Sequence, residues 1–186
     1  MEKAEALIED MNIEKTIYTI HLGVLTRESD GKKLMRIAGV PNTREKRILT
    51  MDGKILGRTV IRGDECGHVR SREYVLLDTM GIPRAVVRPA YAQGEDPTEV
   101  GWPIHRMPAV NRAEVLMDGE VCELVMHDAY CYTLTKVKKM SRVQLRHRGL
   151  GGGWQIESGA DFTPKMLSAF YVFCRYMEQE NDFPLV

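Results

Sequence analysis

Hydrophobic and polar residues alternate along much of this chain with a period of two, which is the pattern of half-buried β-strands. Residues 15–26 (KTIYTIHLGVLT) predict one strand, because they are rich in β-branched and aromatic residues, and a turn sequence, RESDGKK, follows them. A second tract of the same character covers residues 113–148 and resumes at 154–158, after a run of glycines. The pattern predicts a β-rich domain.

Asp-Gly pairs between apolar runs predict two β-hairpins, at residues 48–56 (ILTMDGKIL) and 114–122 (EVLMDGEVC). A type I′ turn requires positive φ at both central residues, which Asp and Gly tolerate. Residues 74–87 predict a third hairpin with Gly81 in its turn, and Pro83 restricts its second strand to a sheet edge or a late start. The Met-Asp-Gly shared at an offset of 66 residues leaves open a duplication of a β module.

Two segments show the spacing of apolar residues that is typical of helices. Residues 2–12 (EKAEALIEDMN) predict a short N-terminal helix. Near the C-terminus, Thr163 as N-cap and Pro164 at the first helical position predict the start of a longer helix. Its apolar face contains Met166, Leu167, Phe170, Tyr171, Phe173, Cys174 and Met177. We expect that face to pack across a sheet, with presentation to a partner as the alternative.

Taken together, these elements predict an α+β fold. It consists of an antiparallel, hairpin-built β-sheet or small barrel, with a short N-terminal helix and a C-terminal amphipathic helix packed on it. The length of 186 residues suits one domain, residues 1–186. The Pro- and Gly-rich segment 89–112 contains Trp102 and His105 and predicts a long loop or a boundary between sub-lobes.

Charge is distributed unevenly along a chain whose formal net charge is zero, a sum that argues against a dedicated nucleic-acid-binding domain. Residues 32–62 contain nine Lys or Arg and two acids, a balance of +7. Residues 136–148 contain six Lys or Arg and no acid, while the remaining segments carry −13. The two basic segments form one positive surface if they meet in space. Otherwise they pair with the acidic segments inside the molecule.

The stretch RHRGLGGGW at 146–154 combines cations, glycines and an aromatic residue. Strand periodicity precedes it and no helix follows, so a phosphate-binding loop is not favoured. A basic β-ribbon remains, in which arginines contact phosphates and Trp154 or Tyr132 stacks on a base. The candidate binding residues are Lys54, Arg58, Arg62, Lys136, Lys138, Lys139, Arg142, Arg146, Arg148 and Trp154. The alternative is an ordinary solvated charged face.

Cysteine and histidine spacing predicts neither a metal site nor a cofactor. Four cysteines, Cys66, Cys122, Cys131 and Cys174, form no C-x-x-C pair, and the five histidines form no metal-binding motif. We expect reduced thiols in a cytoplasmic protein. No leader sequence is recognised, and no apolar run approaches the roughly 20 residues that span a membrane.

Residues 126–136 (MHDAYCYTLTK) are the densest in reactive side chains. His, Tyr and Lys together can support metal-independent phosphodiester cleavage, because a base removes a proton while a cation stabilises the phosphorane. The catalytic candidates are His21, His127, Tyr132 and Lys136. Tyr132-x3-Lys136 with His21 resembles the triad of poxins, viral nucleases that cleave a cyclic dinucleotide, over these three residues alone. Packing of the tyrosines on a sheet is the alternative.

The leading functional hypothesis is a non-catalytic binding protein, of the kind found among phage or viral accessory proteins, that engages nucleic acid or an acidic protein surface through its basic ribbon. The second hypothesis is a phosphodiesterase or nuclease acting on RNA or a cyclic dinucleotide. The third is a structural or oligomerising protein, a homo-oligomer whose basic and acidic segments pair between subunits in the latter case. No membrane partner is expected, and whether the chain is an enzyme is left open.

Overall fold

The computed structural model describes residues 15–63, 72–91, 110–139 and 141–182. The described part is 55% strand and 12% helix. The strands are β1 (Thr16–His21), β2 (Val24–Arg27), β3 (Lys33–Gly39), β4 (Lys46–Leu49), β5 (Ile55–Arg62), β6 (Glu73–Leu77), β7 (Pro83–Tyr91), β8 (Val110–Met117), β9 (Glu120–Asp128), β10 (Cys131–Lys136), β11 (Arg142–His147) and β12 (Trp154–Ser158). The helix is α3 (Pro164–Asp182).

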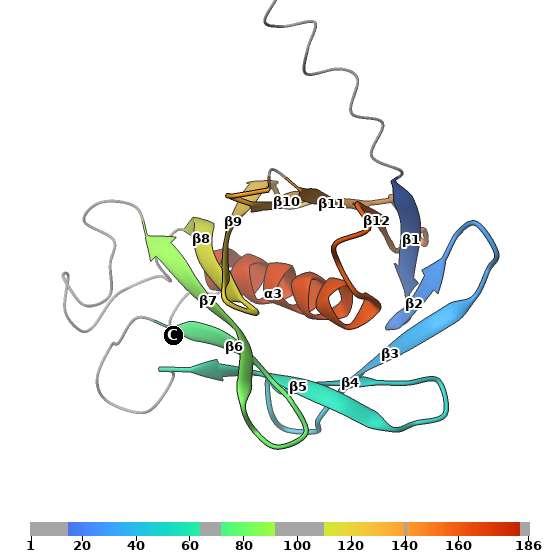
Figure 1. Ribbon diagram of the computed structural model, residues 1–186, viewed down its shortest axis with the longest axis horizontal. Helices are drawn as coiled ribbons and strands as arrows, with labels where there is room; N and C mark the ends of the chain where they lie inside the picture. Colours follow the sequence, from blue (N-terminus) through green and yellow to red (C-terminus); the bar gives the residue numbers. More distant parts are fainter. Residues whose placement is uncertain (1–14, 64–71, 92–109, 140, 183–186) are drawn as a thin grey trace, which may run out of the picture.

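The twelve strands form one closed antiparallel barrel. Each strand pairs with its neighbours in sequence, and β12 closes the ring by pairing with β1, with Ile20 opposite Trp154 and Thr16 opposite Ser158. Figure 1 shows this ring, with β10–β12 above α3 and β3–β5 below it. The predicted α+β fold is therefore wrong. Every strand of the described part is paired on both sides in a closed barrel, and the helix lies inside the barrel instead of on a sheet.

Helix α3 lies within the ring of strands and does not pack across the outside of a sheet (Figure 1). Residues on nearly every side of it are buried: Leu167, Ser168, Ala169, Phe170, Val172, Phe173, Cys174, Tyr176 and Met177. An amphipathic helix on a sheet buries one stripe, whereas burial on all sides indicates an enclosed helix. A barrel wider than about eight strands has a lumen that its own inward side chains do not fill, and α3 fills it here.

The inward faces of the strands and α3 form one continuous core. Tyr74 of β6 meets Tyr176 of α3 edge to face, with ring centroids 5.4 Å apart. On the other side of the lumen, Trp154 packs against Tyr132 and Tyr171, at centroid distances of 6.0 and 6.1 Å. Aromatic residues of wall and helix thus supply much of the contact area that holds α3 in place.

Polar contacts fix both ends of α3. Its first turn is capped as predicted, since the Met166 amide donates to Thr163 Oγ1 at 3.3 Å and Pro164 is the first helical residue. Near its C-terminus, Tyr176 donates its hydroxyl hydrogen to the Arg44 carbonyl at 2.6 Å. Asn181 accepts from the amide of Val110 and donates to the carbonyl of Val110, both at 2.8 Å.

The three predicted hairpins are present. Asp118 and Gly119 both have positive φ (49° and 79°), as a type I′ turn requires. In the first hairpin only Gly53 has positive φ (89°) and its amide donates to the Thr50 carbonyl at 3.1 Å, so this turn is of another type. The two Met-Asp-Gly segments therefore form hairpins of different turn geometry.

The bounds of several strands and of the long loop differ from those predicted. Residues 15–26 form the hairpin β1–β2 rather than one strand, and β7 begins at Pro83, the late start that proline favours. The predicted loop 89–112 is shorter at both ends, because β7 continues to Tyr91 and β8 begins at Val110. The proposed N-terminal helix and residues 92–109, including Trp102 and His105, lie outside the described residues.

The glycine run forms the connection between β11 and β12, as predicted from the strands on either side. A Cβ atom at Gly153 would lie 2.4 Å from the Ile20 carbonyl oxygen, and φ is +66°. At Gly151 φ is +75°, but no atom lies within 4 Å of the same position. Gly153 is thus required both by its backbone conformation and by the close approach of β1.

Candidate functional site: a basic barrel wall

The first basic segment folds into three adjacent strands, β3, β4 and β5, and thereby becomes one wall of the barrel. Alternation along these strands places Ile37 and Ile48 in the core, so Arg36, Arg47 and Arg58 lie on the outer face, where all three are exposed. We call the outer face of β3–β5 the basic wall. The balance of +7 belongs to residues 32–62 as a whole, which comprise these strands and the connections between them.

Arginines are directly opposed on the basic wall. Arg47 is the cross-strand partner of Arg58, and Arg36 lies two residues from Ala38, which is the partner of Arg47. Like charges directly opposite each other in a sheet are destabilising, and diagonal neighbours lie only about 7–8 Å apart. Such a row is costly to the free protein and suits a polyanion that neutralises it.

Glu45 provides the one carboxylate that the structure shows among these arginines. It contacts Arg58 at 3.2 Å and Arg47 at 3.7 Å. A single carboxylate compensates at most one of the two guanidinium charges, and both arginine side chains are about half exposed, so the contribution of these contacts to stability is small. Within the described ranges, Arg36 forms no ion pair. The wall keeps a net positive charge.

The second basic segment lies on the opposite side of the barrel. Its strand β11 is separated from β5 by five strands in either direction around the ring. Figure 1 shows the same separation, with β11 above α3 and β5 below it. The two basic segments therefore do not form one positive surface.

Several candidate binding residues are buried or form ion pairs within the molecule. Trp154 is buried in the core and Lys136 is turned into the lumen. Lys139 pairs with Glu120 at 2.8 Å, and Arg148 pairs with Glu28 at 2.8 Å. The outer surface keeps Lys54, Arg58, Arg62, Lys138, Arg142 and Arg146, all exposed.

The four catalytic candidates are not brought together. Tyr132 and Lys136 face the lumen, whereas His127 is on the outer face, where its Nε2 lies 3.0 Å from Thr133 Oγ1. His21 is beside Gly153 at the opposite end of the barrel from Lys136. Strand β11 spans the distance between these two ends, roughly 20 Å. The residues behind the resemblance to poxins thus do not form a triad in this geometry.

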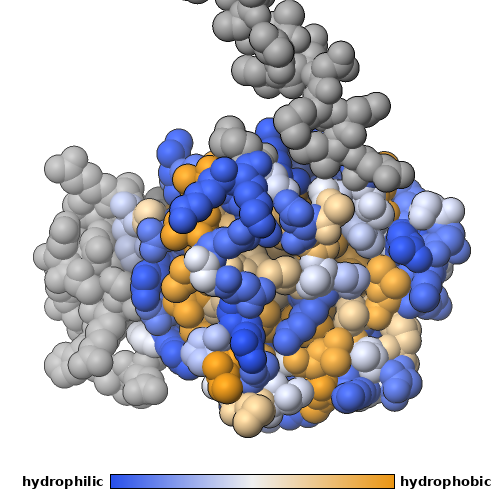
Figure 2. All heavy atoms as spheres, viewed as in Figure 1, coloured by the Kyte–Doolittle hydropathy of each residue, from blue (hydrophilic) through white to orange (hydrophobic). Residues whose placement is uncertain are grey.

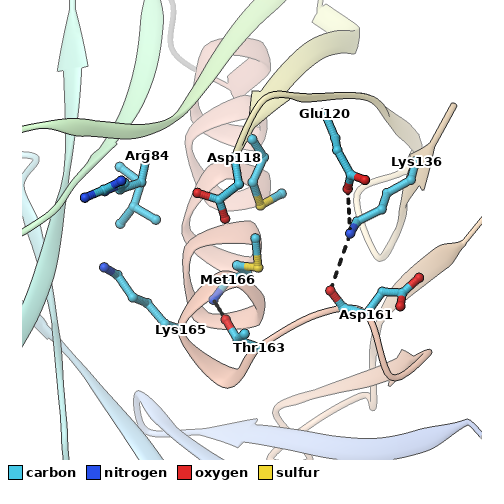
Figure 3. Close-up of a pocket in the computed structure, with 10 residues that line it drawn as sticks. Arg84, Asp118, Glu120, Lys136, Asp161, Thr163, Lys165 and Met166 are labelled. Carbon is cyan, nitrogen blue, oxygen red and sulfur yellow. Dashed lines mark hydrogen bonds and ion pairs between the residues drawn. The ribbon is translucent and has the colours of Figure 1, made fainter. Parts of the chain in front are cut away.

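A cleft of about 510 Å³ opens at the end of the barrel where the chain enters the lumen and α3 begins. Figure 3 shows charged side chains from several elements around it: Arg84, Asp118, Glu120, Lys136, Asp161 and Lys165. Cations and carboxylates are equally represented in this lining. The cleft therefore has no single charge sign that would select a polyanion.

Lys136 ties the loop before α3 to the barrel wall. Its side chain is 8% exposed, and its ammonium contacts Glu120 at 2.8 Å. The same ammonium donates to the Asp161 carbonyl at 3.4 Å and lies 4.8 Å from the centre of the Phe162 ring. Figure 3 shows Lys136 between Glu120 and Asp161. These contacts satisfy a nearly buried charge and give Lys136 a structural role.

The lysines beside Glu120 determine how that carboxyl responds to acid. Hydrogen bonds from Lys136 and then Lys139 lower the pKa of Glu120 from 4.5 to about 2. Because the folded pKa is the lower one, the stabilisation is fully present above pH 4.5 and is lost as the pH falls towards 2.

We therefore expect the native protein to lose stability more steeply between pH 4.5 and 2 than the Glu120→Gln variant, which has no carboxyl to protonate there. Urea unfolding followed by circular dichroism at a series of pH values measures the difference. Parallel pH profiles for the two proteins would contradict the expectation.

Two of the three cysteines in the described part of the chain lie in environments that disfavour the reactive thiolate. Cys122 and Cys174 are buried, and burial raises the pKa of both thiols, well above the ordinary value for Cys174. Cys131 is partly exposed, and Cys66 lies outside the described residues. Among the described residues, no three His, Cys, Asp or Glu side chains group closely enough to hold a metal ion.

Sequence reasoning missed the two most informative residues of the basic wall, Arg36 and Arg47. The available signal was the alternation in KLMRIAG and KRIL, which places both arginines on the polar side of their strands. What the sequence does not contain is the register that sets Arg47 opposite Arg58.

Comparisons with family models, curated proteins and solved structures find no match to this chain. None of the helices in the described ranges combines the length and the apolar character needed to cross a membrane.

Proposed function

We propose that this protein is a non-catalytic binding protein and that its basic wall engages the phosphate backbone of nucleic acid. The observation that carries the proposal is the row of Arg36, Arg47 and Arg58 on three adjacent strands, with Arg47 and Arg58 directly opposed. Guanidinium groups bind phosphates through paired hydrogen bonds, and repulsion between neighbouring arginines is relieved when phosphates lie between them.

The architecture supports a surface site rather than an enclosed one. In the described part, α3 and the inward faces of the strands pack into one core, and the cleft at the end of the barrel has a balanced charge. The outer wall is extended and keeps a net positive charge beside Glu45. Recognition is expected to depend on charge and shape more than on base sequence, because backbone contacts carry no sequence information directly.

The proposal is tested by titrating labelled single- and double-stranded DNA of about 20 nucleotides while fluorescence anisotropy is recorded. We expect affinity in the non-specific range, about 10⁻⁴–10⁻⁶ M at physiological salt, that falls steeply as salt is added. Replacing Arg36, Arg47 and Arg58 together by alanine removes three phosphate contacts. The slope of log K against log salt should then become shallower by about 2–3.

A matched control removes the same charge from strands outside the basic wall. Arg84, Arg88 and Arg112 are exposed arginines of β7 and β8, each paired with an acid. Their triple alanine variant should bind DNA with the native salt slope. Equal losses in both triple variants would show that net charge alone is responsible and would contradict the assigned site. Binding of polyglutamate as tight as that of DNA would identify an acidic protein surface as the partner instead.

A further inference from the structure

A hollow of about 580 Å³ opens at the edge of the basic wall. In the described part, its lining consists of Asn42, Thr43, Arg44, Glu45, Val60 and Ile61. Strands β4 and β5 pair with Lys46 opposite Thr59, so the chain just before β4 lies beside the end of β5. Figure 2 shows hydrophilic and hydrophobic residues interleaved over the lower part of the molecule, where Figure 1 places β4 and β5. The hollow is therefore continuous with the basic wall.

The hollow differs from the basic wall in its chemistry. Of these lining residues, only Arg44 and Glu45 are charged, and their charges are opposite, so a phosphate gains less here than on the wall. Val60 and Ile61 add half-buried apolar surface. The side-chain amide of Asn42 forms no hydrogen bond with any residue that the structure describes, so it is able both to donate and to accept. Apolar surface with a few polar groups suits a neutral heteroaromatic ring better than an anion.

Glu45 belongs to both surfaces. Its carboxylate accepts a hydrogen bond from Arg58 at 3.2 Å and lies 3.7 Å from Arg47. An ionised carboxylate has about four lone-pair sites and no hydrogen to donate, so it has capacity for a further N–H donor. Cytosine presents an amino group at N4, whereas thymine presents the carbonyl oxygen O4 at the same position. The carboxylate of Glu45 therefore favours a base that bears an amino group.

Hydrogen bonds hold the connection that lines the hollow in one shape. Tyr176 of α3 donates its hydroxyl hydrogen to the Arg44 carbonyl at 2.6 Å, which ties the connection to the core. Thr43 Oγ1 accepts from the Glu45 amide and donates to the Val40 carbonyl, both at 3.1 Å. The Val40 amide donates to the Glu45 carbonyl at 3.0 Å. A preformed site loses little conformational freedom when a ligand binds.

We propose that the nucleic acid bound by the basic wall is single-stranded and that the hollow holds one of its unpaired bases, a base that bears an amino group. This inference rests on the proposed function of the basic wall. In a duplex the base edges lie at the bottom of a groove, about 8.5 Å deep in the case of the major groove, and are reached by protruding side chains. A recess in the protein is entered instead by a base that is splayed out from its strand. The phosphates of that strand then contact the arginines of the wall.

Fluorescence anisotropy with three labelled DNA ligands tests the inference. Oligodeoxycytidine and oligodeoxythymidine of about 20 nucleotides carry the same number of phosphates and differ in the base alone. A G·C duplex of about 10 base pairs carries nearly the same number of phosphates with every base paired. The native protein should bind oligodeoxycytidine about tenfold more tightly than oligodeoxythymidine, because a hydrogen bond to a charged acceptor is a strong one. It should also bind oligodeoxycytidine more tightly than the duplex.

Two glutamate variants separate the base preference from the effect of charge. Glu45→Ala removes the acceptor together with a negative charge, so binding of oligodeoxythymidine should not weaken, while the preference for cytosine should fall to within about twofold. Glu73→Ala is the matched control. It removes a carboxylate of β6 that pairs with Arg88 at 2.9 Å, outside the basic wall, and it should keep the tenfold preference.

The outcomes distinguish this inference from the function on which it rests. Equal affinity of the native protein for the two single strands, binding of the duplex as tight as that of oligodeoxycytidine, or an unchanged preference in Glu45→Ala would each overturn the inference. Salt-dependent binding that is lost with Arg36, Arg47 and Arg58 would leave the proposed function intact in those cases. Absence of binding to all three ligands would overturn both.

Discussion

Replacing Phe170 by alanine is expected to lower the free energy of unfolding by about 3–5 kcal/mol. Phe170 lies in the middle of α3 and is 1% exposed. Because strands surround the helix, a side chain removed there leaves a cavity that solvent does not reach and that a closed barrel cannot easily collapse to fill. A helix lying on the outside of a sheet would relax more readily and lose less.

Urea unfolding followed by far-ultraviolet circular dichroism measures this effect, with m-values compared to confirm that both proteins unfold in the same way. Leu150→Ala is the control, because Leu150 is fully exposed, and its stability should stay within about 0.5 kcal/mol of native. A loss below about 1 kcal/mol for Phe170→Ala would argue against an enclosed helix.

Gly153→Ala is the second substitution with a large expected effect, a loss of about 2–5 kcal/mol. A positive φ of +66° costs an alanine roughly 1–2 kcal/mol by itself. The new Cβ would also lie 2.4 Å from the Ile20 carbonyl oxygen, a backbone atom of β1. Relieving this overlap requires movement at the β1–β12 seam that closes the barrel, and overpacking of this kind costs about 1–3 kcal/mol more.

Gly151→Ala separates the two contributions. Its φ of +75° carries the same backbone cost, but nothing lies within 4 Å of the added methyl group. The same urea experiment should give about 1–2 kcal/mol for Gly151→Ala and a clearly larger loss for Gly153→Ala. Equal losses at the two positions would mean that β1 does not approach the glycine connection as described.

Local structure was readable from the sequence because short-range signals determine it. Asp118-Gly119 fixes a type I′ hairpin, and Thr163-Pro164 begins α3, both as predicted. Closure of the barrel was not readable. It depends on the pairing of β1 with β12, in which Ile20 lies opposite Trp154, more than a hundred residues away along the chain. No local pattern specifies which of many alternating strands will pair over such a distance.

The position of α3 was predicted wrongly because the prediction considered only the strongest apolar stripe of the helix. Ala169, Val172 and Tyr176 lie off the predicted stripe and are nevertheless buried. Small and apolar residues around the full circumference indicate an enclosed helix, even where a few polar positions are interspersed. This signal was present in the sequence, but it indicates an enclosed helix only if the strands form a barrel wide enough to hold one.

The basic segments were visible as charge runs, but their arrangement was not. Parity along β10 places Tyr132 and Lys136 together on the inner face, where a lysine pairs internally instead of meeting a ligand. Tyr130 precedes β10 and lies exposed in the turn between β9 and β10. Which face of a strand is buried depends on the strands around it, so charge counting along one strand does not identify which cations reach the surface.

The measurement that tests the proposed site most directly is amide hydrogen exchange of the protein with and without the DNA oligonucleotide. Binding to the basic wall should slow exchange in peptides from β3, β4 and β5 and leave β11, on the opposite side of the barrel, unchanged. Protection centred on β10 and β11, or a complex that forms with no protection of β3–β5, would contradict the assignment of the basic wall as the binding surface.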